Sequence, residues 1–250
     1  MKRLLIAALA AFFSFLLSCQ KIIDFEAPCK ILTLTENYQF DPSSPVQTTT
    51  YTFNYNSHGD PIAILCSNPI TGKPNYFFTY DHKKRLKQSY QMYGPGNIEF
   101  YSIYYYTNNF ITLDTTFIYG GDINNPYSTF QYYQVRKYSY DSKGRISRVD
   151  NWLPVAGQQW SDVYAYDANG NLINGSTYDD KLYFHRTHLV LSFMDRNYSM
   201  NNSGSPVTYN SKKLPLTFLN TWQTDPQARF QNTMVHEITY DCGHGHHGGD

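Results

Sequence analysis

The sequence predicts an all-β fold: an antiparallel meander of tandem hairpins, forming a curled or barrel-like sheet with at most one short helix. Two observations support this prediction. The chain contains 24 tyrosines in 250 residues, and aromatic residues make up 17% of it, which suits pleated, half-buried strands. A short pattern of aromatic residues followed by turn residues also recurs along the chain, as expected of repeated hairpins.

The N-terminal segment has the layout of a secretory signal. Lys2 and Arg3 precede an uncharged, mostly apolar run over 4–18. A short basic segment followed by such a run is typical of a signal peptide, and the run is shorter than the ~20 residues that a membrane-spanning helix needs. We therefore expect residues 1–18 to be a cleaved signal peptide.

The end of this run, Leu16, Leu17, Ser18 and Cys19, resembles the lipobox of bacterial lipoproteins. The resemblance implies cleavage before Cys19, a diacylglycerol on its thiol and an acyl chain such as palmitate on the new N-terminus. Leu17 departs from the family, which has a smaller residue there. Residues 19–28 would be a lipidated tether, and the lipid would anchor the protein to a membrane of the cell envelope, for which we expect the outer membrane. The alternative is an ordinary signal peptide with a chance cysteine.

The remaining chain is predicted to be one β domain over 29–242, followed by a flexible His/Gly tail over 243–250. Without Lys2 and Arg3 the chain has 18 basic and 20 acidic residues. A nearly neutral chain lacks the concentrated cations that a nucleic acid requires, so no nucleic acid is expected as a partner.

Three cysteines of this domain, Cys29, Cys66 and Cys242, allow one disulfide in an envelope location. A bond between Cys29 and Cys242 would clasp the two ends of the domain, whereas Cys29 with Cys66 would close a smaller loop. The first pairing is favoured because both of its cysteines flank the repeats, but the sequence leaves both open.

Five segments share the repeated pattern: an aromatic or apolar residue, any residue, Tyr, a turn that begins with Asp or Asn, and an aliphatic residue or Pro. The turns read NSHGDPI (56–62), DHKKRL (81–86), DSKGRI (141–146), DANGNL (167–172) and NSKKLPL (210–216). A degraded copy follows Tyr106, and a final half copy ends at Tyr240. The anchoring tyrosines Tyr55, Tyr80, Tyr106, Tyr140 and Tyr166 are separated by 25, 26, 34 and 26 residues.

One unit can be interpreted residue by residue. The two aromatic residues before each turn lie on the same strand face, because side chains alternate along a strand. Asp141 bends the chain by bonding to nearby backbone, and Gly144 supplies the left-handed conformation of a tight turn. Ile146 then starts the return strand. Asp167 and Gly170 have the same roles in the next unit.

The segments YDSKGRI at 140–146 and YDANGNL at 166–172 resemble the YD-repeat (Rhs-type) family, whose units read YD-x-x-G-[RN]-[LI]. The units that begin at Tyr55, Tyr80 and Tyr209 depart from it by Asn for Asp, Lys for Gly, or Pro in the aliphatic position. The resemblance implies tandem hairpins and no particular chemistry. The chain is similar to small bacterial envelope lipoproteins that carry a few degenerate units.

Loops are predicted at 94–97, 120–126 and 201–206, where Gly, Pro and Asn gather. The stretch 182–200 allows two interpretations, because its apolar residues fit either the alternation of a strand or one face of a helix. It is the one place in the domain where a helix is expected.

No catalytic, cofactor or metal site is predicted. Asp167, Asn169 and Asn171 alternate as in a calcium loop, but Gly170 falls at its fourth position instead of its sixth, and the repeat turn accounts for all four residues. The tail over 243–250 offers histidines as weak metal ligands, yet a glycine-rich terminus lacks the fixed geometry of a built site. The chain contains no G-x-S-x-G and no glycine-rich phosphate loop.

Tyrosines fall on both alternation phases at 104–106 and 132–133, so we expect Tyr104 to be buried and Tyr105 to face outward. Exposed aromatic faces mark interaction surfaces, and Tyr105 and Tyr133 are predicted to face a ligand. The predicted function is a non-enzymatic binding or scaffolding module for a glycan or another envelope protein. The alternative is an envelope hydrolase that acts on polysaccharide. A flat aromatic strip would favour binding, and a polar cleft with two close carboxylates would favour hydrolysis.

Overall fold

The computed structural model describes residues 29–38, 45, 47–203, 206–218 and 235–243. In this part of the chain there are a large sheet of thirteen strands, a small sheet of two strands and four short helical segments. The predicted signal peptide, Cys19 with its tether and residues 244–250 of the tail lie outside the described residues.

The large sheet is an antiparallel meander, because each strand from β1 to β10 pairs with the next one along the chain. The predicted all-β fold of tandem hairpins is therefore confirmed. Its strands are, in spatial order, β10 (Gln158–Val163), β9 (Ile146–Leu153), β8 (Tyr132–Tyr140), β7 (Phe110–Gly120), β6 (Asn97–Thr107), β5 (Leu86–Gly94), β4 (Asn75–Tyr80), β3 (Pro61–Cys66), β2 (Gln47–Tyr55), β1 (Lys30–Tyr38), β15 (Val235–Asp241), β14 (Pro215–Phe218) and β13 (Pro206–Tyr209). The small sheet pairs β11 (Tyr178–Leu182) with β12 (Asn201–Ser203).

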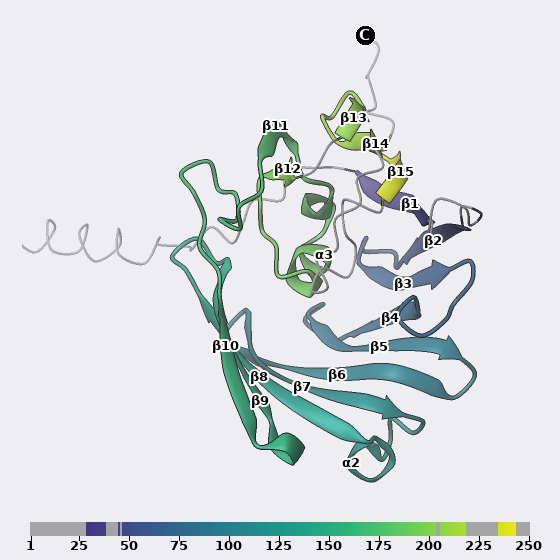
Figure 1. Ribbon diagram of the computed structural model, residues 1–250, viewed down its shortest axis with the longest axis vertical. Coiled ribbons are helices and arrows are strands. Elements are labelled where there is room, and N and C mark those ends of the chain that lie inside the picture. The colour runs from purple at the N-terminus through teal and green to yellow at the C-terminus, as the bar shows by residue number, and fades with distance from the viewer. Residues whose placement is uncertain (1–28, 39–44, 46, 204–205, 219–234, 244–250) are drawn as a thin grey trace, which may run out of the picture.

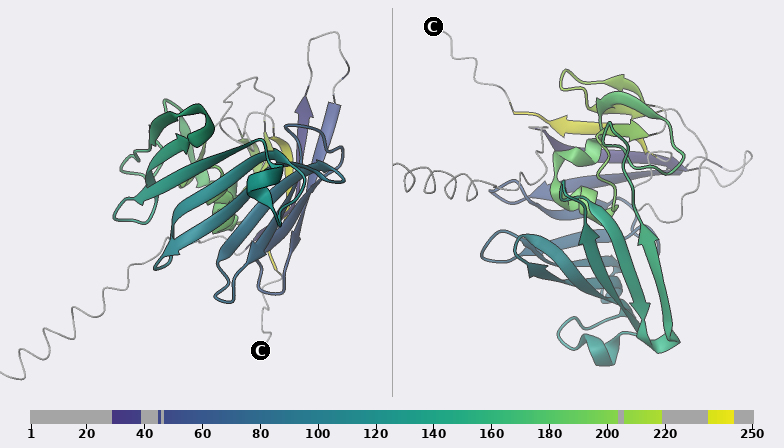
Figure 2. Two further views of the ribbon diagram at one scale, coloured as in Figure 1. Left: turned by 90° about the horizontal axis from the view of Figure 1, so that it is seen from below. Right: turned by 90° about the vertical axis from the view of Figure 1, so that its left-hand side faces the viewer.

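The sheet is curled but open, with β10 and β13 at its two edges, so the barrel alternative is wrong. Twist accumulates from strand to strand, and an open sheet of this many strands curls as a result. Figure 1 shows the strands curving around α3 (Leu189–Met194), and Figure 2 shows the same curl from two further sides.

The helical segments are α2 (Pro126–Thr129), α3, η1 (Pro154–Ala156) and η2 (Phe184–Thr187). Two short α-helices thus replace the single one that the sequence predicted. Of the two interpretations of 182–200, the helical one is correct for α3. The missed α2 lies at the end of a predicted loop and begins at Pro126, whose fixed φ suits the first position of a helix.

The main core lies between the concave face of the sheet and the segment 183–198, which contains η2 and α3. The ring of Phe193 packs against Tyr104 and Tyr138 of the sheet, with centroids 5.6 and 5.3 Å apart. Phe184 and Leu191 of the same segment are almost fully buried. Burying each such side chain contributes about 1.5–3 kcal/mol. The segment therefore covers the concave face of the sheet and stabilises the fold by this packing.

A disulfide joins Cys29 and Cys242, the pairing that the flanking positions favoured. It lies where β1 pairs with β15, so the first and last strands of the domain are bonded both through backbone and through sulfur. Cys66 is a free, buried cysteine.

Candidate functional site

Each repeat turn is a corner that its first residue holds together. In the turn after Tyr140, Asp141 Oδ1 accepts hydrogen bonds from the backbone N–H groups of Lys143 and Arg145, at 2.9 and 3.0 Å. Gly144 has a φ of 77°, the left-handed conformation that the sequence predicted. Asn56, Asp81, Asp167 and Asn210 accept from backbone N–H groups of their own turns in the same way.

An arginine joins one corner to the next. Arg85 Nε donates to Asp81 Oδ2 at 2.8 Å, and the Arg85 guanidinium carbon lies 4.3 Å from the ring centroid of Tyr106 in the next repeat. Hydrogen bonds from the backbone and side chain of Arg85 lower the pKa of Asp81 to about 2. The carboxylate therefore orients a cation over an aromatic face, a favourable contact. The second such joint consists of Asp141, Arg145 and Tyr166, with 3.9 Å between the guanidinium carbon and the ring centroid.

The anchoring tyrosines form a second kind of joint. The hydroxyl of Tyr80 donates to the carbonyl of Pro61 at 2.7 Å, and that of Tyr106 donates to the carbonyl of Leu86 at 2.9 Å. Pro61 and Leu86 are the residues that close the preceding turns, so each tyrosine bonds to the corner before its own. Burial raises the pKa of these tyrosines, which keeps them as donors. Tyr55 bonds in the same way to Ile31, Tyr140 to Ile111 and Tyr240 to Pro215.

The degraded repeat after Tyr106 interrupts this row of corners. Thr107 pairs with Phe110 across a short turn, and no arginine is available there to stack on the next anchor. Phe110 packs against Tyr140 instead, with the rings tilted and 4.8 Å between their centroids. A cavity of about 270 Å³ lies at this place, between the corners and α3. We call it the corner cavity; its walls include Tyr80, Tyr106, Phe110, Tyr140, Val190 and Phe193.

His188 and Asp60 form one polar edge of the corner cavity. His188 Nδ1 accepts a hydrogen bond from the Val190 N–H at 3.2 Å and thereby caps α3, while its Nε2 lies 3.4 Å from Asp60 Oδ1. Burial lowers the pKa of His188, and the Asp60 carboxylate opposes this effect. The ring is therefore neutral near pH 7, as an Nδ1 acceptor requires.

A second candidate surface lies on the convex face of the sheet. Tyr105 is 46% exposed and Trp152 is 44% exposed, whereas Tyr104 is buried on the opposite face as predicted. Strand register places Tyr105 in one row with Lys137 and Asp150. We call the group of Tyr105, Lys137, Arg148, Asp150 and Trp152 the convex platform. Arg148 Nε donates to Asp150 Oδ1 at 2.7 Å, and both side chains remain accessible to solvent.

Tyr133, the other residue predicted to face a ligand, is half-buried. Its ring packs against Phe117 of β7 and Tyr127 of α2, with centroid distances of 6.1 and 5.6 Å. Tyr101, Phe117 and Tyr133 are aligned across three strands, and α2 covers this row. The sequence did not predict α2, and Tyr133 therefore lies in a small aromatic core instead of on an open face.

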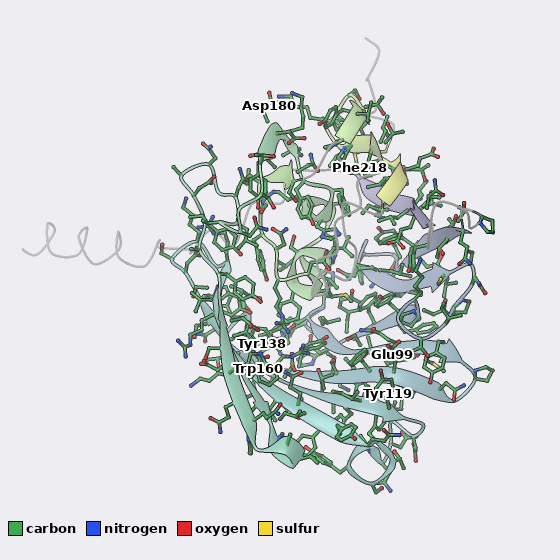
Figure 3. All side chains as sticks on the ribbon, viewed as in Figure 1. Glu99, Tyr119, Tyr138, Trp160, Asp180 and Phe218 are labelled. Carbon is green, nitrogen blue, oxygen red and sulfur yellow. A yellow bond between two sulfur atoms is a disulfide. The ribbon has the colours of Figure 1, made fainter. Side chains whose placement is uncertain are left out.

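A buried polar network on the concave face was not predicted from the sequence. Arg136 Nε donates to Asp114 Oδ1 at 2.9 Å, and the Tyr138 hydroxyl donates to Asp114 Oδ2. Burial opposes the charge on Arg136, but Asp114 outweighs it and raises the pKa of Arg136. Tyr138, labelled in Figure 3, also contacts Phe193. The network is enclosed between sheet and cover, so it is a structural element and offers no open site.

The residues that alternate as in a calcium loop form the repeat turn after Tyr166. Asp167 Oδ1 accepts from the Asn171 N–H at 2.8 Å, and Gly170 has a φ of 88°. The two strands predicted to flank this turn shrink to one bridge between Tyr166 and Leu172. No cluster of three or more metal-ligating side chains exists among the described residues. In the same part of the chain, no helix has both the length and the apolar character to cross a membrane.

Comparisons with known proteins add little to this geometry. The sequence matches no protein-family model and no curated protein. Among solved structures, it is similar to a chain of the "Crystal Structure of TcdB2-TccC3-Cdc42", with 9% identity and a TM-score of 0.27. The similarity covers 74% of this chain but only 11% of that one. A likeness this weak carries no argument about function, which must come from the site.

Proposed function

We propose that the protein is a non-enzymatic binding module of the bacterial cell envelope, anchored in the outer membrane through a lipid on Cys19, which holds a glycan on its convex platform. The corners, with their Tyr–Asp–Gly–Arg bonding, also support the proposal that the chain is a short, degenerate relative of the YD-repeat proteins. The observation that carries the function is the exposure of Tyr105 and Trp152 on one sheet face among polar side chains.

The chemistry of the convex platform favours a glycan over a protein partner. The faces of tyrosine and tryptophan rings are apolar and rigid, so they suit the C–H faces of sugar rings. Lys137, Arg148 and Asp150 offer charged donors and acceptors, which form strong hydrogen bonds with hydroxyl groups. Tyrosine, tryptophan and arginine are enriched at protein–protein interfaces, whereas lysine and aspartate are depleted there, so the preference for a glycan rests on Lys137 and Asp150.

The lining of the corner cavity supports binding over hydrolysis. Glycoside hydrolysis uses two carboxyl groups about 5–10 Å apart on either side of the scissile bond. The cavity is lined by one carboxylate, Asp60, which lies against His188. We therefore do not propose the hydrolase that the sequence left as the alternative.

A glycan array tests the proposed function directly. Tyr105→Ala and Trp152→Ala should each lower glycan affinity about tenfold or more while the melting temperature stays close to that of the wild type, because exposed anchors contribute to binding and little to folding. Trp160→Ala is the matched control, since Trp160 is also 44% exposed but lies in register with Asn151 on the opposite face. Equal binding by all three variants would contradict the proposal. Retention of an envelope protein that depends on Tyr105 and Trp152, without any glycan signal, would replace the glycan by that protein.

The anchor has its own test. Cys19→Ala removes the thiol that would receive the diacylglycerol, so the variant should leave the membrane fraction or accumulate as precursor. Metabolic labelling with a palmitate analogue should mark the wild type and not the variant. A processed Cys19→Ala protein that still sediments with membranes would show that the attachment is not a lipid on this residue.

A further inference from the structure

The corner cavity has the walls of a small-molecule site, is slightly smaller than the ~300–1,000 Å³ of most ligand pockets, and is separate from the convex platform. Its volume is about 270 Å³, and one water occupies about 30 Å³ of liquid, so the cavity has room for about nine non-hydrogen atoms. Ligand pockets are concave and largely apolar, with a few polar groups that orient the ligand. The corner cavity has this composition, with aromatic and aliphatic walls and polar residues at its edge.

The tyrosines of the walls present ring atoms to the cavity while their hydroxyls are occupied. The hydroxyls of Tyr80, Tyr106 and Tyr140 donate to the backbone carbonyls of the preceding corners, at 2.7 to 2.9 Å. A sugar, whose hydroxyl groups each need a hydrogen-bond partner, is poorly served by such walls. An apolar ligand body fits them well.

At the edge, one lysine has no carboxylate partner among the described residues, and one carboxylate lies beside a neutral histidine. The Asp60 carboxylate lies against His188, and the Arg85 guanidinium is paired with Asp81. Lys84 also lines the cavity, is exposed, and forms no ion pair within the described residues. An anionic group on the ligand would therefore find Lys84 available as its partner.

We propose that the corner cavity binds a small carboxylate whose apolar body, aromatic or short acyl, fills the space between the tyrosines and α3, with the carboxylate on Lys84. The site exists because the degraded repeat has a shorter turn than its neighbours and carries Phe110 where they carry arginine. The shorter turn and Phe110, which make this copy depart from the repeat pattern, thus create the space for the ligand.

Isothermal titration calorimetry of the full chain with phenylacetate and with octanoate tests the proposal. At least one should bind, and comparing the two identifies the ligand body as aromatic or acyl. Lys84→Gly should weaken binding of the carboxylate about threefold to fivefold, the scale of one exposed ion pair. Phenylacetamide, which lacks the charge, should show no difference between wild type and Lys84→Gly.

Lys213→Gly is the matched control for this substitution. Lys84 and Lys213 occupy the same turn position with φ of 60° and 63°, so glycine should relieve the same strain in both, and only Lys84 lines the cavity. Leu189→Trp, at a partly exposed cavity position, should block binding of both carboxylates without touching the charge. Failure of both carboxylates to bind at millimolar concentration would overturn the proposal. Equal affinities of Lys84→Gly and Lys213→Gly would overturn it too.

Discussion

At the scale of the residue, each position of the repeat motif has a specific hydrogen-bonding partner or backbone conformation. Asp141 accepts from two backbone N–H groups and from Arg145. Asn56 and Asn210 accept from the backbone of their own turns in the same way, so the carboxylate adds the bond to the arginine, and a side chain without an acceptor would leave these donors unpaired. The glycine position requires a left-handed backbone, and Lys84 and Lys213 adopt it as well. Glycine is therefore the least strained choice at this position without being obligatory.

Gly170 should be the least replaceable of the corner glycines. Its φ is 88°, and an added Cβ would lie 2.8 Å from Met200 Cγ. Gly72 has a similar φ of 82° with nothing within 4 Å of such a Cβ, so it isolates the strain. Gly72→Ala should lower the free energy of unfolding by about 1 kcal/mol, and Gly170→Ala by more, as measured by urea unfolding. Equal losses would mean that Met200 moves aside freely.

The turns were predictable because their bonds are local. Asp141 and its partners lie within four residues of each other, and the residue types alone indicate the turn. The joints between corners were not predictable in this way. Tyr140 bonds to a carbonyl 29 residues away, and Asp114 meets Arg136 across 22 residues. Such partners depend on strand register, which the sequence pattern indicates without fixing it.

At the scale of the element, α3 is a short helix that tertiary contacts hold in place. A helix of six residues is too short to be stable alone, and Phe193 and Leu191 provide the packing. Its first turn depends on one side-chain acceptor, His188 Nδ1. The sequence left 182–200 undecided because its apolar spacing fits both periods, and the contact with the sheet decides between them.

The helix cap predicts a pH dependence. Burial holds the pKa of His188 below 6.5, so near this value the unfolded chain binds a proton more readily than the folded one. The free energy of unfolding should therefore be constant above about pH 7 and fall as the pH drops below 6.5. His188→Asn keeps a capping acceptor that does not titrate, and urea unfolding at pH 7.5 and 5.5 should show a smaller loss for it. Asp81 and Asp141 have lowered pKa values and act below pH 4. Identical losses for variant and wild type would contradict the role of His188.

At the scale of the whole molecule, the domain is a long sheet whose ends differ. One end is the free strand β10, and near the other β15 returns to β1 under the disulfide. The meander was predictable from repeated turns, since each turn joins neighbouring strands. The open curl was not, because closure depends on the sum of many small twists and on the cover over the concave face.

The disulfide should matter more for stability than for shape. Cys29 and Cys242 are 213 residues apart, and loss of a native disulfide costs about 2–5 kcal/mol. Cys242→Ser should lower the free energy of unfolding by this amount and speed hydrogen exchange in β1 and β15 before β6 and β7. The double variant Cys29→Ser/Cys242→Ser should cost no more than either single variant. Additive losses would indicate that the two sulfurs are not bonded in solution.

The joints between corners bear on how such a chain changes length during evolution. Tyr80 reaches back to the previous corner, and Arg85 reaches forward to the next. One unit of 25 or 26 residues therefore contains a tyrosine that bonds to the unit before it and an arginine that contacts the unit after it. An in-frame gene duplication of that unit would supply complete joints on both sides of the new copy, with no compensating substitution. A partial duplication would break a joint, so the geometry of this sheet favours the gain or loss of whole units.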